Sequence, residues 1–174
     1  MYQDFNMHNY YGFDNFDYRG DYNYQNPNLQ NIYGGEIITL NQAINLIRQS
    51  VGGEREDEMF YDILIKQAPT EKEKDIITSI RNDERKHNKI LRDLYYSFTG
   101  NMIPQDMTIP NLDDGLDYKG NLEKALFGEL DAVVRYRRIL GSMPSGDSYT
   151  LLMSIMTDEL RHASKYNFLI HSAK

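Results

Sequence analysis

The sequence contains the pattern Asp-Glu-x-x-His twice, as DERKH starting at Asp83 and as DELRH starting at Asp158. Carboxylates and imidazoles are metal ligands and proton carriers, and on a helix residues three apart share one face. One Glu-x-x-His alone is a weak indication of a site, because such pairs also occur on solvated helix surfaces. Whether the two copies form one site depends on the elements that carry them.

Both copies belong to a longer internal repeat. His162 lies 75 residues after His87, and the two glutamates of the patterns keep the same offset. The offset also relates three further pairs, namely Glu54 and Glu129, Tyr61 and Tyr136, and Pro69 and Pro144. A constant offset is typical of a duplicated supersecondary unit. The sequence therefore predicts two similar helical hairpins, each of which turns at its proline.

Helix signals support this division. Thr39 with Gln42, and Thr70 with Glu73, are capping boxes that predict two helix starts. Apolar residues recur at helical spacing in residues 39–68, 70–100, 122–139 and 147–172, and residues 144–146 should break the third helix. The stretch NMIPQDMTIPNLDDG after Gly100 is too irregular for either element and is interpreted as a crossover. We therefore expect an all-α fold, an antiparallel four-helix bundle made of two duplicated helical hairpins joined by a long crossover.

The distances from the turns place the acidic residues in one layer. Glu54 and Glu84 lie 15 residues on either side of Pro69, and the second hairpin repeats this spacing around its own proline. At about 1.5 Å per residue, each glutamate is roughly 22 Å from its turn. In a bundle, one layer then receives four carboxylates and two imidazoles, those of Glu54, Glu84, His87, Glu129, Glu159 and His162.

Four carboxylates inside a bundle repel one another and are costly to desolvate. Two divalent cations would supply four positive charges and so match the four negative ones. Mixed oxygen and nitrogen ligands suit iron or manganese. We expect two iron ions, or alternatively two manganese ions, with two glutamates bridging and one glutamate and one histidine for each ion.

This pattern resembles the ferritin-like superfamily and, within it, the rubrerythrin-like di-iron carboxylate proteins. It consists of a lone glutamate on the first and third helices and Glu-x-x-His on the second and fourth, over about residues 39–172. The resemblance implies that the six residues are metal ligands and that no further catalytic residue is needed. It also implies an oxidoreductase that reacts with hydrogen peroxide or dioxygen, as a peroxidase or ferroxidase in oxidative-stress defence or iron handling.

The chain departs from the rubrerythrin pattern in two ways. It has no cysteine, so it lacks the cysteine-ligated rubredoxin centre, and we expect an external electron-donor protein. Rubrerythrins carry an extra glutamate three residues after the third-helix ligand, where this chain has Ala132. Asp57, three residues after Glu54, faces the same way and is a candidate seventh metal ligand, with Glu58 as a competitor. A solvated acid is the alternative for Asp57.

Four further residues are candidates to support the ligands. Tyr61 and Tyr136 each follow a glutamate of the layer by seven residues, so a phenol could reach a metal-bound carboxylate or, alternatively, a backbone carbonyl. Asp83 and Asp158 precede the histidines by four residues. Metal-bound imidazole usually donates its other N–H to a carboxylate or a carbonyl, which favours this role over a surface position.

Composition restricts the partners. The formal net charge of −7 argues against a nucleic-acid partner held by a basic surface. The first residues show neither a cationic region nor an apolar one of a secretory signal, and no apolar run approaches the roughly 20 residues of a membrane span. We expect no nucleic-acid and no membrane partner, and a cytoplasmic protein. A homodimer is expected by analogy alone.

Residues 1–35 differ from the bundle domain of residues 36–174. They are rich in tyrosine, asparagine, aspartate and glycine and show no helical or strand period, which is typical of a disordered segment. This N-terminal segment could bind a partner or mediate assembly, or it could be a dispensable tail. Two other functions stay open. Because the same ligands suit manganese, one is a dimanganese catalase-like enzyme. The composition of residues 1–35 suggests the other, a structural, packaged protein similar to spore-coat proteins and associated with the spore.

Overall fold

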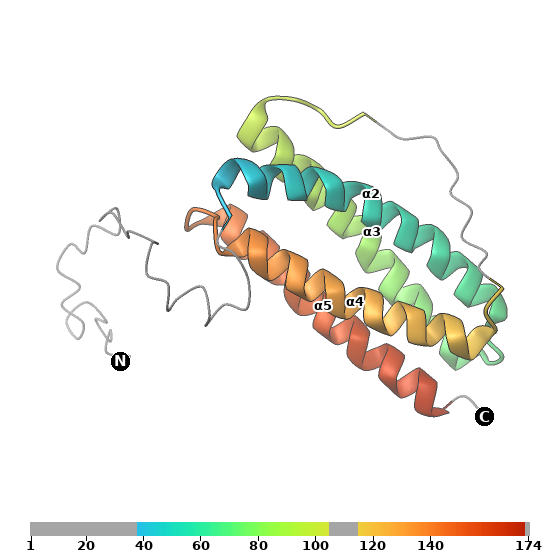
Figure 1. The fold of residues 1–174 in the computed structure, drawn as a ribbon. Helices are drawn as coiled ribbons and strands as arrows, with labels where there is room; N and C mark the ends of the chain where they lie inside the picture. Colours follow the sequence, from blue (N-terminus) through green and yellow to red (C-terminus); the bar gives the residue numbers. More distant parts are fainter. Residues whose placement is uncertain (1–37, 105–114, 173–174) are drawn as a thin grey trace, which may run out of the picture. The chain divides into compact units, whose positions relative to one another are not determined.

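The computed structural model describes residues 38–104 and 115–172. These residues form four long helices: α2 (Leu40–Gln67), α3 (Glu71–Thr99), α4 (Tyr118–Leu140) and α5 (Asp147–Ser172). Helices that pack against each other run in opposite directions, whereas α3 and α4, which follow one another in the chain, run the same way (Figure 1). The prediction of an all-α four-helix bundle is confirmed. The predicted N-terminal segment and residues 105–114 of the predicted crossover lie outside the described residues.

The first hairpin begins and ends as the sequence predicts. The side chain of Thr39 accepts a bond from the backbone N–H of Gln42, whose own side chain accepts from the backbone N–H of Thr39. Thr70 and Glu73 form the same capping box at the start of α3. Gly100 ends α3 with a φ of 68°, a left-handed conformation that suits glycine.

The third helix ends one residue after its predicted apolar pattern, which is residues 122–139, and before the predicted break at residues 144–146. The sequence indicated a break at Pro144, but α4 stops at Leu140. The backbone N–H groups of Ser142 and Met143 donate to carbonyls three residues earlier, at 3.0 and 3.1 Å, which makes a tight turn. The hydroxyl of Ser142 also donates to the carbonyl of Ile38, just before α2. These bonds turn the chain before the proline is reached.

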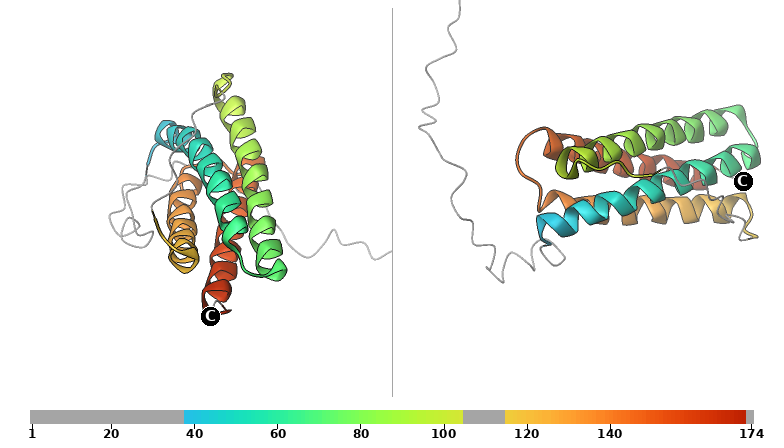
Figure 2. Two further views of the ribbon diagram at one scale, coloured as in Figure 1. Left: turned by 90° about the vertical axis from the view of Figure 1, so that its right-hand side faces the viewer. Right: turned by 90° about the horizontal axis from the view of Figure 1, so that it is seen from above.

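Each hairpin packs along its length, α2 against α3 and α4 against α5. Contacts of α2 with α4 and of α3 with α5 close the bundle (Figure 2). No helix in the part of the chain that the structure describes is both long and apolar enough to cross a membrane.

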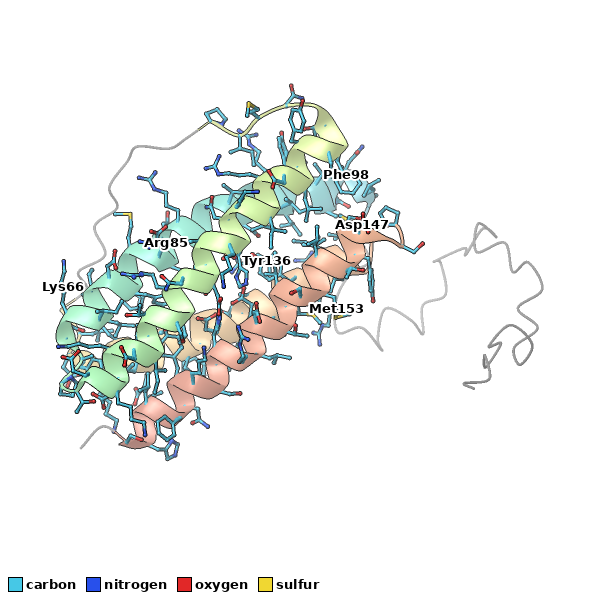
Figure 3. The ribbon with its side chains drawn as sticks, turned by 180° about the vertical axis from the view of Figure 1, so that it is seen from behind. Lys66, Arg85, Phe98, Tyr136, Asp147 and Met153 are labelled. Carbon is cyan, nitrogen blue, oxygen red and sulfur yellow. The ribbon has the colours of Figure 1, made fainter. Side chains whose placement is uncertain are left out.

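The apolar core is divided into two clusters. Both contain aliphatic side chains with no exposed surface, whose burial stabilises the bundle by about 1.5–3 kcal/mol for each side chain. The first cluster includes Ile47, Leu91, Ile139, Leu152 and Ile155, and the second includes Leu64, Ile77, Ile80, Leu122 and Leu169. Tyr136 belongs to the first and lies inside the bundle, whereas Arg85 lies on the outside (Figure 3). The six candidate ligands are buried but belong to neither cluster, and they form a polar layer in the interior.

Candidate metal centre

The structure brings all six predicted ligands together. Each is at most 3% exposed. Their potential ligand atoms form two groups, and within each group these atoms lie within 4.8 Å of one another. Glu84 and Glu159 belong to both groups, which places them where bridging ligands would lie. The first group is Glu54, Glu84, His87 and Glu159, and the second is Glu84, Glu129, Glu159 and His162.

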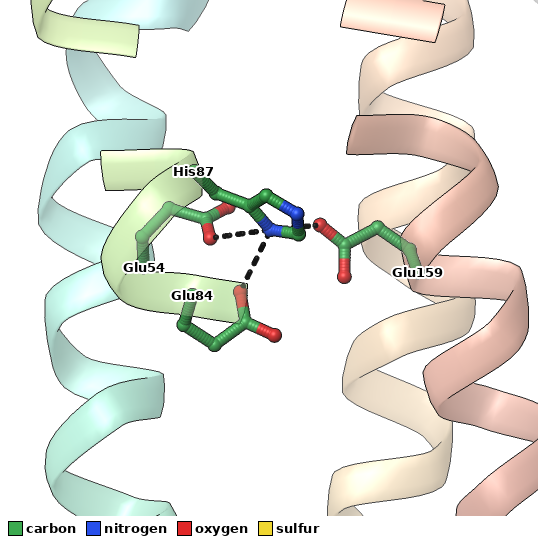
Figure 4. A group of neighbouring side chains, drawn as sticks. All are labelled: Glu54, Glu84, His87 and Glu159. Carbon is green, nitrogen blue, oxygen red and sulfur yellow. Dashed lines mark hydrogen bonds and ion pairs between the residues drawn. The ribbon is translucent and has the colours of Figure 1, made fainter. Parts of the chain in front are cut away.

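Three carboxylate oxygens surround the Nδ1 atom of His87. The distances are 3.1 Å to Glu84 Oε2, 3.3 Å to Glu159 Oε1 and 3.4 Å to Glu54 Oε2 (Figure 4). The carboxylates come from three helices, α2, α3 and α5. A ring nitrogen carries at most one hydrogen, so it can donate to only one of these oxygens.

The Nδ1 atom of His162 has the same surroundings. It lies 3.0 Å from Glu84 Oε1, 3.3 Å from Glu159 Oε2 and 3.5 Å from Glu129 Oε2. The two histidine rings are stacked, with centroids 5.8 Å apart. The two halves of the centre are therefore copies of one arrangement, as the 75-residue repeat predicts.

Hydrogen bonds do not satisfy this cluster. Three buried carboxylate oxygens, Glu54 Oε2, Glu84 Oε1 and Glu159 Oε1, have no hydrogen-bond partner among the described residues, although each lies near a ring nitrogen. Unpaired buried polar atoms are costly and rare. Ligands at about 2.1 Å from a first-row or magnesium-like cation are separated from one another by about 3.0–3.4 Å, which matches the distances found here. The donor set therefore fits a metal ion at each histidine.

Without cations the cluster attracts protons. Burial, and next the neighbouring carboxylate of Glu54, raise the pKa of Glu84 well above its usual value. Burial would lower the pKa of His162, but the surrounding carboxylates of Glu129, Glu159 and Glu84 raise it to about 12. Burial opposes ionisation of Glu159 as well, yet the neighbouring rings of His162 and His87 lower its pKa to about 2. The arrangement thus requires positive charge, which either protons or metal ions can supply.

The two tyrosines bond to carboxylates of the opposite hairpin. Tyr61 Oη on α2 donates to Glu129 Oε1 on α4 at 2.7 Å, and Tyr136 Oη on α4 donates to Glu54 Oε1 on α2. Both phenols are buried. Of the two partners that the sequence left open, a carboxylate or a backbone carbonyl, the structure shows the carboxylate, and it belongs to the other hairpin.

The two aspartates also cross between hairpins. His87 Nε2 lies 3.3 Å from Asp158 Oδ2, and His162 Nε2 lies 3.3 Å from Asp83 Oδ2. Arg161 Nη2 joins the two aspartates, at 2.8 Å from Asp83 and 2.9 Å from Asp158. A carboxylate on Nε2 holds the ring so that Nδ1 faces the cluster. Each aspartate therefore contacts the histidine of the opposite hairpin and not the one four residues later.

Asp57 lies outside both groups of converging ligand atoms. Its side chain is partly buried on α2. Burial, and next the charge of Glu54, raise its pKa to about 7, against the opposing effect of Arg135. The expectation of a seventh ligand at Asp57 stays a prediction, and the six-residue cluster is complete without it.

Sequence reasoning did not indicate Arg161 or Tyr166. Arg161 lies inside the DELRH pattern itself, and its link between the two aspartates depends on helix packing. Tyr166 is fully buried, with its ring 5.5 Å from that of Tyr61, and within residues 38–104 and 115–172 its hydroxyl has no hydrogen-bond partner. Because Tyr166 lies four residues after His162 on the same helix, the two side chains share a face, and this spacing is the sequence signal that could have indicated Tyr166.

Comparisons of the chain with protein-family models, with curated proteins and with solved structures find no match. The likeness to rubrerythrin-like proteins therefore stays a prediction from the spacing of six residues. What the chain can do chemically follows from the donor atoms themselves: four carboxylates and two imidazoles, buried and arranged in two overlapping groups.

Proposed function

We propose that this protein is a non-haem dimetal carboxylate oxidoreductase that holds two iron ions and reacts with hydrogen peroxide or dioxygen. The observation that supports it is the convergence of three carboxylate oxygens on the Nδ1 atom of each buried histidine. Glu54 and His87 would hold one ion, Glu129 and His162 the other, and the remaining two glutamates would bridge them.

Charge supports two divalent ions over one. Four ionised glutamates carry four negative charges, and neutral imidazoles add none, so two divalent cations leave the centre neutral. A neutral cluster avoids the large cost of isolated charge in an apolar interior. The same ligands also suit manganese, so the identity of the metal is the first quantity to measure.

Two iron(II) ions would supply the two electrons that, with two protons, reduce one hydrogen peroxide molecule to two water molecules. The residues of the chain would tune this chemistry. Tyr61 and Tyr136 hold the carboxylates of Glu129 and Glu54 in one orientation through their hydroxyls. Apolar clusters pack the bundle interior around this polar layer, which limits the access of water. Because the chain has no cysteine, the electrons would return from a separate donor protein.

Reconstitution tests the proposal. The metal-free protein is loaded with iron(II) without oxygen, and its oxidation is followed by stopped-flow absorbance after mixing with hydrogen peroxide or with dioxygen. Faster oxidation by peroxide supports a peroxidase, and faster oxidation by dioxygen supports a ferroxidase. Glu56→Gln is the matched control for Glu54→Gln, because Glu56 is an exposed residue of the same helix.

Two results would contradict the proposal and favour another function. Manganese in the native protein together with oxygen release from peroxide would indicate a dimanganese catalase. A protein that binds no divalent metal but loses its assembly when residues 1–35 are deleted would indicate the structural role instead.

A further inference from the structure

A cavity lies on the outer side of the first hairpin. Its volume is about 390 Å³, and it is lined by Arg55, Glu58, Asn88, Arg92 and Ile103. Arg55 and Asn88 directly follow Glu54 and His87 in sequence, so the cavity is at the height of the candidate metal centre, but its lining includes none of the six candidate ligands. This volume is within the range of small-molecule sites.

One guanidinium of the cavity is held in place. Arg92 Nε donates to Asn88 Oδ1 at 2.9 Å, and Arg92 Nη1 donates to the carbonyl of Ile103 at 2.8 Å. The amide of Asn88 is itself fixed, because its Nδ2 donates to the carbonyl of Val51 at 2.8 Å. These bonds leave Arg92 Nη2 for a ligand. A donor that is already oriented loses little entropy on binding.

A second guanidinium of the cavity is unpaired in the part of the chain that the structure describes. Arg55 is partly buried but makes no hydrogen bond or ion pair with any residue in the described ranges. Glu58 is the acidic residue of the lining, and Arg85 Nε binds it at 2.6 Å. The described lining residues therefore carry excess positive charge, on a chain whose formal net charge is −7.

The repeat shows that neither the fold nor the metal centre needs these arginines. At the positions 75 residues later, the second hairpin has Leu130 in place of Arg55, Val133 in place of Glu58 and Asn167 in place of Arg92. The second hairpin nevertheless supplies the same set of buried ligands. The polar lining thus belongs to the first hairpin alone and is not explained by the duplication.

We propose that this cavity binds a small anion that carries a phosphate or carboxylate group, with Arg55 and Arg92 as its ligands. Guanidinium groups present two parallel donors that match the oxygens of either group. Ile103 offers an apolar contact for the rest of such a molecule. The site is separate from the dimetal centre and does not depend on the proposed redox function.

Calorimetric titration of the purified full-length protein at low ionic strength tests the proposal, with inorganic phosphate and succinate as probes. Arg55→Leu introduces the residue that the second hairpin has at the equivalent position, and Arg55→Lys keeps the charge but loses the paired donors. Arg48→Leu makes the same charge change at an exposed position of α2 and is the control.

We expect at least one probe to bind to the wild type and to the Arg48→Leu variant alike, and about tenfold or more weakly to Arg55→Leu. Arg55→Lys should bind with intermediate affinity. A response to phosphate alone or to succinate alone identifies which group is recognised. The proposal is wrong if neither probe binds, if Arg55→Leu binds as the wild type does, or if Arg48→Leu weakens binding equally.

Discussion

Tyr61 on α2 donates a hydrogen bond of 2.7 Å to Glu129 on α4, and the repeat reproduces this bond between Tyr136 and Glu54. Neither tyrosine contacts the glutamate of its own helix through such a bond. The aspartates likewise reach the histidines of the opposite hairpin. Each hairpin therefore supplies candidate ligands that the other one orients, so the candidate centre is complete only when both hairpins are packed together.

Tyr61→Phe should weaken metal binding without loss of the fold. Phenylalanine keeps the ring in the core but removes the bond to Glu129, and a hydrogen bond to a charged group contributes about 1.5–3 kcal/mol. We expect the metal affinity to fall about 10- to 100-fold, measured by competition with a chelator of known affinity. Tyr96→Phe, at an exposed tyrosine, is the control and should bind as the wild type does. Equal affinities in all three proteins would contradict the role of Tyr61.

Asp83 and Asp158 each contact the histidine of the opposite hairpin, and this predicts which pairs of substitutions are energetically coupled. In the metal-free protein, Asp158→Asn combined with His87→Gln should change the free energy of unfolding non-additively, by about 0.5 kcal/mol or more, because these residues are in contact. The coupling of Asp158→Asn with His162→Gln should be smaller. Urea unfolding of the single and double variants measures both values. A stronger coupling of Asp158 to His162 than to His87 would show that Asp158 supports the histidine of its own helix instead.

Removal of the metal ions should destabilise the bundle. At a free metal concentration 1,000 times the dissociation constant, each ion contributes about 4 kcal/mol to stability. For a domain of this size, the loss corresponds to a fall in Tm of about 10 °C or more. Scanning calorimetry before and after chelation measures it, and re-addition of the metal should restore the original Tm. An unchanged Tm would mean that the buried carboxylates do not depend on metal.

Stability should depend on pH in opposite directions with and without metal. In the metal-free protein the pKa of His162 is raised from 6.5 to about 12, and that of Glu84 is raised well above 4.5. The stability that these protons contribute is fully present below the unfolded pKa values and is lost as pH rises toward the folded ones, so unfolding should become easier between pH 6.5 and 9. The pKa of Glu159 is lowered to about 2, so the stability that its ionised form contributes is lost only as pH falls in the acid range, below this window.

Metal ions displace the same protons, so their apparent affinity rises with pH. The metal-loaded protein should therefore become more stable between pH 6 and 8. Tm values of both forms across this range test the prediction. If Tm changes with pH in the same direction and by the same amount in both forms, the histidines and glutamates do not exchange protons for metal.

Local sequence rules predicted most of the fold. The capping boxes at Thr39 and Thr70 and the helix end at Gly100 depend on neighbouring residues alone, and the structure has all three where they were expected. The height of Glu54 and Glu84 along the bundle follows from the helical rise, which packing hardly changes. The six residues could therefore be grouped from spacing.

Lateral contacts could not be predicted in the same way. Which helix lies beside which, and how far each is rotated, decides that Tyr61 meets Glu129 and that Asp83 meets His162. These relations depend on side-chain packing across the whole bundle. The end of α4 before the predicted break has a similar origin, because the contact between Ser142 and Ile38 joins residues that are 104 positions apart.

The metal content of the purified protein tests the central proposal most directly. Elemental analysis after anaerobic reconstitution should give two iron ions, or two manganese ions, for each chain. Glu84→Gln and Glu159→Gln should lose both ions because each residue belongs to both ligand groups, Glu54→Gln should lose one, and the exposed control Glu56→Gln should keep two. A wild-type chain that retains no divalent metal, or variants of Glu84 and Glu159 that retain two, would contradict the dimetal centre.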